Sequence, residues 1–317
     1  MITVLTEPKG YSEKAIATLQ TLGPVLTWEE AERGNRLKDA EILVVKLGMR
    51  ISKEVMDRMP NLKIIGTSTT GLNHIDTEEA ERRGIAIASL RGETEFLRTI
   101  YPTAEETIGL MIMLMRNLHL GYEGVLRGKW LKEQSYGHEL YGKILGLIGF
   151  GRLGSMVARF GKVFNMRVIA NDPNVAADVM REEGAEKVSL EDVFKESDVV
   201  SIHVLYDNAT HHMIGREHFH MMKPTAYYIN TARGELHDEA ALLEALEKKK
   251  IAGAALDVLE NEDPKGEHLK GHPLVEYAKT HPNLIIVPHL GGATFESMSR
   301  TEEFIAEKIV KVVRSTI

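Results

Sequence analysis

Short runs of apolar residues recur along the chain, separated by polar stretches and turn residues. Most of these runs are apolar throughout, which is the pattern of strands buried on both faces of a sheet. The expected strands are Ile2–Thr6, Ile42–Lys46, Lys63–Gly66, Ile85–Ala88, Ile144–Ile148, Arg167–Ala170, Val199–His203, Ala226–Ile229, Ala252–Leu256 and Leu284–Val287.

Amphipathic segments with helical spacing lie between these runs. The expected helices include Thr77–Arg83, Arg152–Phe164, Leu190–Phe194, Asp238–Lys249 and Ser297–Val313. Buried strands that alternate with helices predict an α/β chain, in which parallel sheets carry helices on both faces.

The alternation is interrupted at one place, where we expect the first crossing between two domains. A longer helix is expected at Pro102–Leu118, and a polar stretch expected to be irregular follows from Gly121 to Tyr141. The last helix makes the first domain discontinuous if it packs back on it. We therefore predict one domain of residues 1–100 plus 293–317 and another of residues 101–292, with a cleft between them.

Composition and charge exclude several classes of function. The chain has 317 residues, a net charge of −7 and no cysteine, so disulfides and thiolate metal sites are excluded and a phosphate backbone is a poor partner. The start of the chain shows no secretory signal, and the apolar run Ile108–Met115 is too short to span a membrane. We expect a cytoplasmic protein that binds neither nucleic acid nor membrane.

A glycine-rich loop follows the expected strand Ile144–Ile148 and opens an expected helix. Its sequence is Gly149-Phe150-Gly151-Arg152-Leu153-Gly154. Glycines at this spacing permit a tight turn, close approach of a pyrophosphate and close packing of helix on strand, while the helix N-terminus supplies amide donors. The motif predicts a dinucleotide site, and a simple glycine-rich turn is the alternative.

Asp172 ends the next expected strand, 18 residues after Gly154. A carboxylate at this position accepts hydrogen bonds from the ribose hydroxyls of NAD and repels the 2′-phosphate of NADP. The alternative is a cap or turn aspartate before Pro173. The sequence favours NAD as the cofactor.

Polar residues also follow three later strands, at the sheet edge where open α/β sheets bind ligands. Arg233 offers a planar fork suited to a carboxylate, and His289 is a candidate general acid or base. Glu262 could hold His289 in one tautomer and favour its protonated form.

These residues resemble those of the D-isomer-specific 2-hydroxyacid dehydrogenases, in particular the phosphoglycerate dehydrogenase-like branch. The matching motifs cover nearly the whole chain and include GFGRLG, INTARGELHDEAAL, GAALDVLENE and VPHLGGAT. The resemblance implies two Rossmann-like, doubly wound parallel-sheet domains with a cleft between them, and a homodimer formed through the nucleotide domain.

The resemblance also implies roles for single residues. Arg233 would grip the substrate carboxylate, while His289, tuned by Glu262, would protonate the carbonyl oxygen as hydride arrives from NADH. The expected cofactor-binding residues are Gly149, Gly151, Arg152, Leu153, Gly154, Asp172, His203, Thr231, Ala232 and Asp257, and the expected substrate-binding residues are Lys46, Thr70, Gly71 and Arg233.

Two further basic residues bear on the substrate. Lys46 stands where phosphoglycerate-type members often carry a substrate-binding base, and a solvated surface lysine is the alternative. Arg98 could reach the cleft or form an interdomain ion pair. If both bases converge, they predict a substrate with a second anionic group.

The remaining histidines and aromatic residues suggest weaker hypotheses. Four histidines, His211, His212, His218 and His220, lie within ten residues, but no supporting carboxylate pattern accompanies them, so we expect a solvated helix or loop and no metal site. Trp130, with its neighbours Leu126 and Leu131, is a candidate arm between subunits.

The preferred function is NAD-dependent interconversion of a 2-keto acid and a D-2-hydroxy acid, with His289 as the general acid or base. One alternative is an NAD(H)-responsive, non-catalytic interaction protein similar to the corepressors of this family. A phosphite-type dehydrogenase is another. Glu262 argues against a formate-type enzyme, which usually carries an amide at that position.

Overall fold

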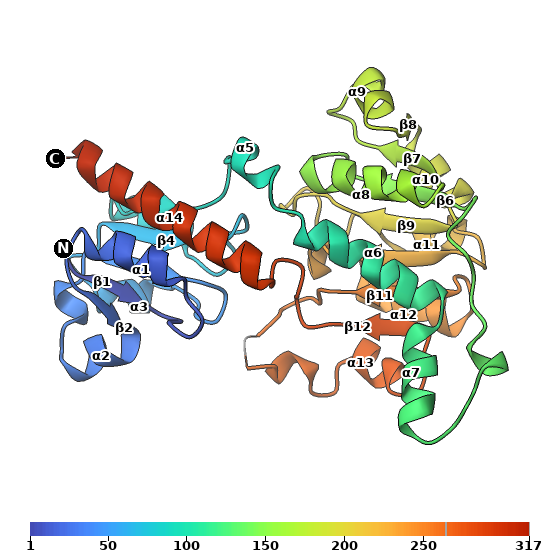
Figure 1. Ribbon diagram of the computed structural model, residues 1–317, viewed down its shortest axis with the longest axis horizontal. Coiled ribbons are helices and arrows are strands. Elements are labelled where there is room, and N and C mark those ends of the chain that lie inside the picture. Colours follow the sequence, from blue (N-terminus) through green and yellow to red (C-terminus); the bar gives the residue numbers. More distant parts are fainter. Residues whose placement is uncertain (264, 317) are drawn as a thin grey trace. The chain divides into compact units, whose positions relative to one another are not determined.

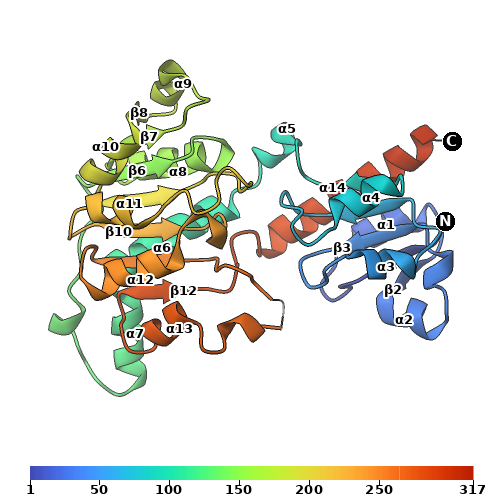
Figure 2. The same cartoon turned by 180° about the vertical axis from the view of Figure 1, so that it is seen from behind.

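The computed structural model describes residues 1–263 and 265–316. They form two compact units, which Figures 1 and 2 show from opposite sides. The first unit is Met1–Ile100 with Ala293–Ile317, and the second is Tyr101–Gly292.

The first unit is built on a five-stranded parallel sheet with the order β2-β1-β3-β4-β5. Its strands are β1 (Thr3–Leu5), β2 (Val25–Thr27), β3 (Ile42–Val45), β4 (Ile64–Thr67) and β5 (Ala86–Ala88). The middle strands β3 and β4 are buried along their whole length, as their apolar runs predict.

Helices cover both faces of this sheet (Figure 1). One face packs against α1 (Glu13–Gln20) and the long α14 (Phe295–Thr316), and α5 (Thr94–Leu97) adds Leu97 to the same core. The other face packs against α2 (Trp28–Arg33), η1 (Leu37–Asp39), α3 (Lys53–Asp57) and α4 (Thr77–Arg82). Because α14 supplies Ile305 and Ile309 to the core, the last segment of the chain is part of the first unit.

The second unit contains a seven-stranded parallel sheet with the order β12-β11-β10-β9-β6-β7-β8. Its strands are β6 (Ile144–Ile148), β7 (Arg167–Asn171), β8 (Glu186–Lys187), β9 (Val199–Ile202), β10 (Tyr227–Asn230), β11 (Gly253–Leu256) and β12 (Leu284–Ile286). The strand order reverses at β6, which lies between β7 and β9, and ligands bind at such switch points in open α/β sheets.

Two layers of helices enclose this second sheet. The core on one face includes α6 (Pro102–Met115), α8 (Arg152–Val163) and α9 (Ala177–Glu182). The core on the other face includes α10 (Leu190–Glu196), α11 (Arg216–Met221), α12 (Glu239–Glu247) and α13 (Pro273–Ala278). The shorter elements are α7 (Leu118–Leu126), η2 (Glu133–Ser135), η3 (Gly234–Leu236) and η4 (Glu267–Leu269).

The predicted α/β class with two parallel sheets is confirmed, and each expected strand is present with its ends shifted by at most one residue. Two strands escaped prediction, because β2 is three half-buried residues and β8 is two exposed residues at the sheet edge. Neither carries the apolar run that marks a buried strand. Within the described residues, no helix combines the length and the apolar character needed to cross a bilayer.

The expectation of an irregular stretch from Gly121 to Tyr141 is wrong at its start, where α7 continues to Leu126. The long helix expected through Leu118 ends at Met115, and Asn117 adopts a left-handed conformation with φ +51° between α6 and α7. Helix α7 exposes Leu118, Tyr122, Val125 and Leu126, so its apolar residues do not mark a buried stripe.

Candidate active site

Three neighbouring strands of the second unit bring the predicted acid–base residues to one edge of the sheet. Arg233 follows β10, Asp257 directly follows β11, and His289 follows β12. The strand ends are joined by backbone hydrogen bonds from Asp257 N to Asn230 O and from His289 N to Asp257 O. The carboxyl ends of parallel strands therefore place these three segments side by side.

His289 and Glu262 form a direct pair at this edge. His289 Nδ1 lies 2.6 Å from Glu262 Oε2, and both side chains are partly exposed. Burial by itself raises the pKa of Glu262, but the hydrogen bond and charge of His289, the Leu259 N–H and the charge of Arg233 together lower it below its ordinary value. Glu262 is thus ionised and accepts from Nδ1–H, which leaves Nε2 as the nitrogen that can exchange a proton with a substrate.

Arg233 is positioned by a fully buried asparagine at the end of β10. The Asn230 amide donates to Arg233 O at 2.8 Å, and its Oδ1 accepts from Ala232 N at 2.9 Å. His237 lies behind this turn, with Nδ1 2.9 Å from the same amide nitrogen, and burial lowers the pKa of His237 to about 3. His237 is therefore a neutral, buried support of the Arg233 turn.

Gly234 allows the Arg233 turn to touch the loop that carries Glu262. A Cβ atom on Gly234 would lie 2.1 Å from the Leu259 carbonyl carbon and 2.4 Å from Glu260 N. Any side chain here would push the two loops apart, so this glycine sets the separation of Arg233 from Glu262.

A second carboxyl group, Glu106 on α6, lies beside Asp257. Asp257 is buried and accepts hydrogen bonds from Leu290 N and from Gly291 N, the latter at 2.9 Å. A Cβ on Gly291 would lie 3.1 Å from both Asp257 Oδ2 and Glu106 Oε2. Burial and the charge of Asp257 raise the pKa of Glu106 to about 8. A raised pKa favours the protonated form of Glu106 beside the Asp257 carboxyl group.

The glycine-rich loop joins β6 to α8 with the geometry that its spacing predicts. Gly149 has φ +88°, and a Cβ on it would lie 2.7 Å from His203 O. A Cβ on Gly154 would lie 2.2 Å from Gly149 O, whereas one on Gly151 would meet nothing within 4 Å. The loop is therefore closely packed against its own sheet and open at Gly151, where backbone can approach a pyrophosphate. Arg152 and Leu153 form the first turn of α8.

Asp172 and His203 flank this loop at the ends of β7 and β9. Asp172 accepts from Phe150 N and from Asn174 N, each at 2.9 Å. The turn hydrogen bond to Asn174 is the alternative role expected for Asp172, and the bond to Phe150 also ties this carboxylate to the glycine-rich loop. His203 Nε2 lies 3.0 Å from Ser201 Oγ, and burial lowers the pKa of His203 to about 4, so its ring is neutral at pH 7.

The other two cofactor candidates lie between β10 and Arg233. Thr231 is buried, and its hydroxyl lies 2.9 Å from that of Thr107 on α6. Ala232 is partly buried, and its carbonyl accepts a hydrogen bond from the Arg233 guanidinium at 2.6 Å. This short segment therefore links the glycine-loop side of the sheet edge to the acid–base side.

The candidates of the first unit lie at the carboxyl ends of β3 and β4. Thr70 and Gly71 are in the loop after β4, where Thr69 Oγ1 donates to Gly71 O at 2.8 Å. Lys46 directly follows β3 and forms an ion pair with Glu302, so the alternative of a solvated surface lysine is wrong. Arg98 is exposed and forms an ion pair with Glu95, one turn away in the same segment.

The histidine cluster requires a correction. The sequence showed no supporting carboxylate pattern around His211 and His212, but the fold brings Glu260 into hydrogen-bond contact with His212 Nε2. The rings of His211 and His212 stack with centroids 4.0 Å apart. The carboxylate lies in the loop after β11, far away in the sequence, which is why local spacing did not reveal it.

Comparison with known proteins identifies the family. The model of the NAD-binding domain of D-isomer specific 2-hydroxyacid dehydrogenases matches residues 108–291. The chain belongs to this family. A glyoxylate reductase of Pyrococcus furiosus is 36% identical over 98% of this chain and 92% of its own length. A D-3-phosphoglycerate dehydrogenase of Methanocaldococcus jannaschii is 37% identical, and the chain spans 58% of its length.

Solved structures of this 2-hydroxyacid dehydrogenase family have the same architecture. A D-lactate dehydrogenase of Aquifex aeolicus, solved with NAD and lactic acid, matches with a TM-score of 0.83 and 30% identity, over 99% of this chain and 96% of that one. The chain is therefore an NAD-dependent oxidoreductase. Its own residues fit NAD, because the loop is open at Gly151 and the carboxylate of Asp172 lies beside it.

Sequence reasoning missed two residues that shape this edge. Asn230 lies inside the INTARGELHDEAAL motif, and its position at the last residue of a parallel strand was the available signal. Glu106 lies within the helix α6, where nothing in the local sequence distinguishes it from the exposed Glu105 beside it. Only the packing of α6 against the β11 end reveals its contact with Asp257.

Proposed function

We propose that this enzyme reduces a 2-keto acid to the D-2-hydroxy acid with NADH, or catalyses the reverse oxidation, with His289 as the general acid or base. The observation that carries this proposal is the 2.6 Å hydrogen bond between His289 Nδ1 and Glu262 Oε2 at the same sheet edge as Arg233. A histidine oriented by an ionised carboxylate is suited to proton exchange with a carbonyl or hydroxyl oxygen.

The bound nicotinamide supplies the hydride for reduction and accepts it in oxidation. In the proposed mechanism Arg233 binds the substrate carboxylate through its planar guanidinium and so orients the neighbouring carbonyl group. His289 Nε2 donates its proton to the carbonyl oxygen, and Glu262 stabilises the charged imidazole before this transfer. In the oxidative direction, neutral His289 accepts the hydroxyl proton.

The cofactor contacts are proposed from the second unit. The glycine-rich loop and the first turn of α8, with Arg152 and Leu153, receive the pyrophosphate, and Asp172 binds the ribose hydroxyls. The buried carboxylate of Asp257 is held by two backbone N–H groups and is the proposed acceptor for the nicotinamide carboxamide. His203, Thr231 and Ala232 are the remaining proposed cofactor contacts.

The experiment measures NADH oxidation with glyoxylate, pyruvate and hydroxypyruvate for wild type and for His289→Asn. The variant should lose about 10²–10⁴-fold in kcat, which is the usual contribution of general acid catalysis, with its affinity for NADH retained. His220→Asn, at an exposed position on α11, is the matched control and should keep wild-type kcat. Wild-type turnover by His289→Asn would refute the acid role.

We also propose that the enzyme is a homodimer that uses the second unit. This is supported by a group of exposed, large apolar side chains in and after α7, namely Leu118, Tyr122, Val125, Leu126 and Trp130, of which Trp130 is 85% exposed. Apolar surface of this kind marks interaction sites in proteins. A cytoplasmic location remains a prediction that rests on the absence of cysteine.

A further inference from the structure

Two loops of the second unit bring three side chains of metal-binding types together at its surface. His211 and His212 lie in the loop after β9, and Glu260 lies in the loop after β11. One ring nitrogen of each histidine and one carboxylate oxygen of Glu260 lie within 4.8 Å of one another. In the part of the chain that the structure describes, no other three histidine, aspartate or glutamate side chains meet in this way.

The backbone and a neighbouring tyrosine hold the two histidines in place. His212 N donates to Glu235 O at 2.8 Å, and His212 has φ +49°, a left-handed conformation that histidine adopts more readily than most residues. The rings of His211 and His212 stack with an angle of 17° between their planes, and the Tyr206 hydroxyl lies 3.4 Å from His211 Nδ1. The two imidazole rings are therefore ordered before a ligand arrives.

Glu260 is fixed from the other side through its own backbone. Its N–H donates to Glu239 Oε1 at 2.9 Å, and Glu239 Oε2 lies 3.0 Å from His272 Nε2. A Cβ on Gly234 would lie 2.4 Å from Glu260 N, so this loop also packs directly on the Arg233 turn. Because both loops are held in this way, little order has to be created when an ion binds between them.

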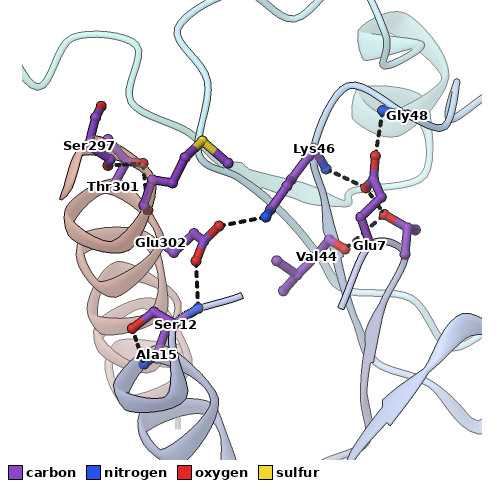
Figure 3. A network of polar contacts seen from close by, with 11 residues as sticks. Glu7, Ser12, Ala15, Val44, Lys46, Gly48, Ser297, Thr301 and Glu302 are labelled. Atoms are coloured by element: carbon purple, nitrogen blue, oxygen red, sulfur yellow. Dashed lines mark hydrogen bonds and ion pairs between the residues drawn. The ribbon is translucent and has the colours of Figure 1, made fainter. Parts of the chain in front are cut away.

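The partner of the Glu260 carboxylate distinguishes this group from an ordinary ion pair. In the first unit, Glu302 has Lys46 Nζ at 2.6 Å and Ser12 N at 2.7 Å, so a metal ion there would have to displace a lysine (Figure 3). Among the described residues no lysine or arginine pairs with Glu260, whose carboxylate contacts His212 Nε2 instead. Imidazole and carboxylate can bind the same ion, whereas an ammonium group has no lone pair to offer.

We propose that His211, His212 and Glu260 bind a divalent transition-metal ion, for which Zn²⁺ is the best fit, and that this ion links the loop after β9 to the loop after β11. Two imidazole nitrogens and one carboxylate oxygen suit Zn²⁺, and water completes its four-coordinate shell. Ligand atoms of a tetrahedral zinc ion lie about 3.4 Å apart, so side-chain rotation alone brings the three groups into place. The ion replaces the present contact between His212 and Glu260.

Isothermal titration calorimetry of the untagged chain with Zn²⁺ tests this site directly. We expect one ion per chain, and Mg²⁺, which prefers oxygen ligands, should not bind there. His212→Asn keeps a residue that tolerates the left-handed backbone, and Glu260→Gln keeps the size of the side chain. Each should weaken Zn²⁺ binding by at least about a hundredfold. The matched control is His220→Asn, an exposed histidine of α11 outside the group, which should bind Zn²⁺ like wild type.

The outcomes distinguish this site from the His289–Glu262 pair. Zn²⁺ binding that persists in His212→Asn and Glu260→Gln but is lost in His289→Asn would assign the ion to that pair and overturn the proposal. A wild-type chain that binds no Zn²⁺ at about 10 µM free ion would also overturn it. Thermal unfolding supplies a second measure, because an ion that binds only the folded state raises the Tm of wild type and not that of the two variants. None of these measurements uses catalytic activity, so the proposed reaction can fail without affecting this inference.

Discussion

Glu106→Gln offers a quantitative test of the carboxyl pair at the end of β11. Glu106 lies beside Asp257, and burial with the nearby Asp257 charge raises its pKa from 4.5 to about 8. The substitution preserves the shape of the side chain and replaces a carboxyl group that can ionise by an amide that cannot. The variant should therefore fold like wild type and lose one pH-dependent contribution to stability.

The sign and size of that contribution follow from linkage. Because the pKa of Glu106 is higher in the folded state than in the unfolded state, the folded state binds the extra proton between pH 4.5 and about 8. The stabilisation is complete below pH 4.5 and is lost as the pH rises through about 8, at up to about 1.4 kcal/mol per pH unit. Glu106 is half-buried, so solvent screening reduces the expected loss between pH 6 and pH 8 to about 1–1.5 kcal/mol.

Thermal unfolding at pH 6 and pH 8 measures this loss. In a domain of this size 1 kcal/mol corresponds to about 2–4 °C, so wild type should lose roughly 2–6 °C more than Glu106→Gln over this range. Glu105→Gln, an exposed neighbour on the same helix, should follow wild type at both pH values. Parallel curves for wild type and Glu106→Gln would refute the raised pKa of Glu106, since Glu106 would then be ionised throughout this range.

Three other substitutions test separate features. Gly234→Ala should destabilise the second unit by about 1–3 kcal/mol and lower kcat, because its Cβ would lie 2.1 Å from the Leu259 carbonyl carbon. The control is Gly109→Ala, which has open space around it and should be neutral or stabilising in thermal unfolding. Asp172→Asn should reduce the preference for NADH over NADPH by about tenfold or more in kcat/KM, and an unchanged ratio would argue against ribose recognition by this carboxylate. Trp130→Ser should shift the protein toward monomer in light scattering after gel filtration, and a wild-type mass would exclude this side chain from the dimer interface.

Local sequence was sufficient for the features that depend on local chemistry. The strands β6 and β11 consist entirely of apolar or small residues. This pattern is the one expected of strands that are buried on both faces of a sheet. The glycine-rich loop has the open face at Gly151 that its spacing predicts. The positions of Arg233 and His289 follow from the rule that the carboxyl ends of parallel strands share one edge.

Features that depend on distant parts of the chain could not be read in this way. The partner of Lys46 lies on α14, at the other end of the sequence, and no local pattern distinguishes Glu302 from Glu303. Glu260 and His212 are likewise in contact although they are far apart in the sequence. In each case the pairing depends on how sheets and helices pack. The sequence therefore identified the lysine and the histidines as candidates but could not predict their partners.

The first unit is built from two separate stretches of the chain, and this affects the order in which the two units fold during synthesis. Chains grow from the N-terminus, and domains generally fold as units during synthesis. The first hundred residues emerge without Ile305 and Ile309, which complete their core, and without Glu302, which neutralises Lys46. The second unit, which is continuous in sequence, can therefore fold before the first one, although its residues are synthesised later. The first unit is completed only after α14 has been synthesised.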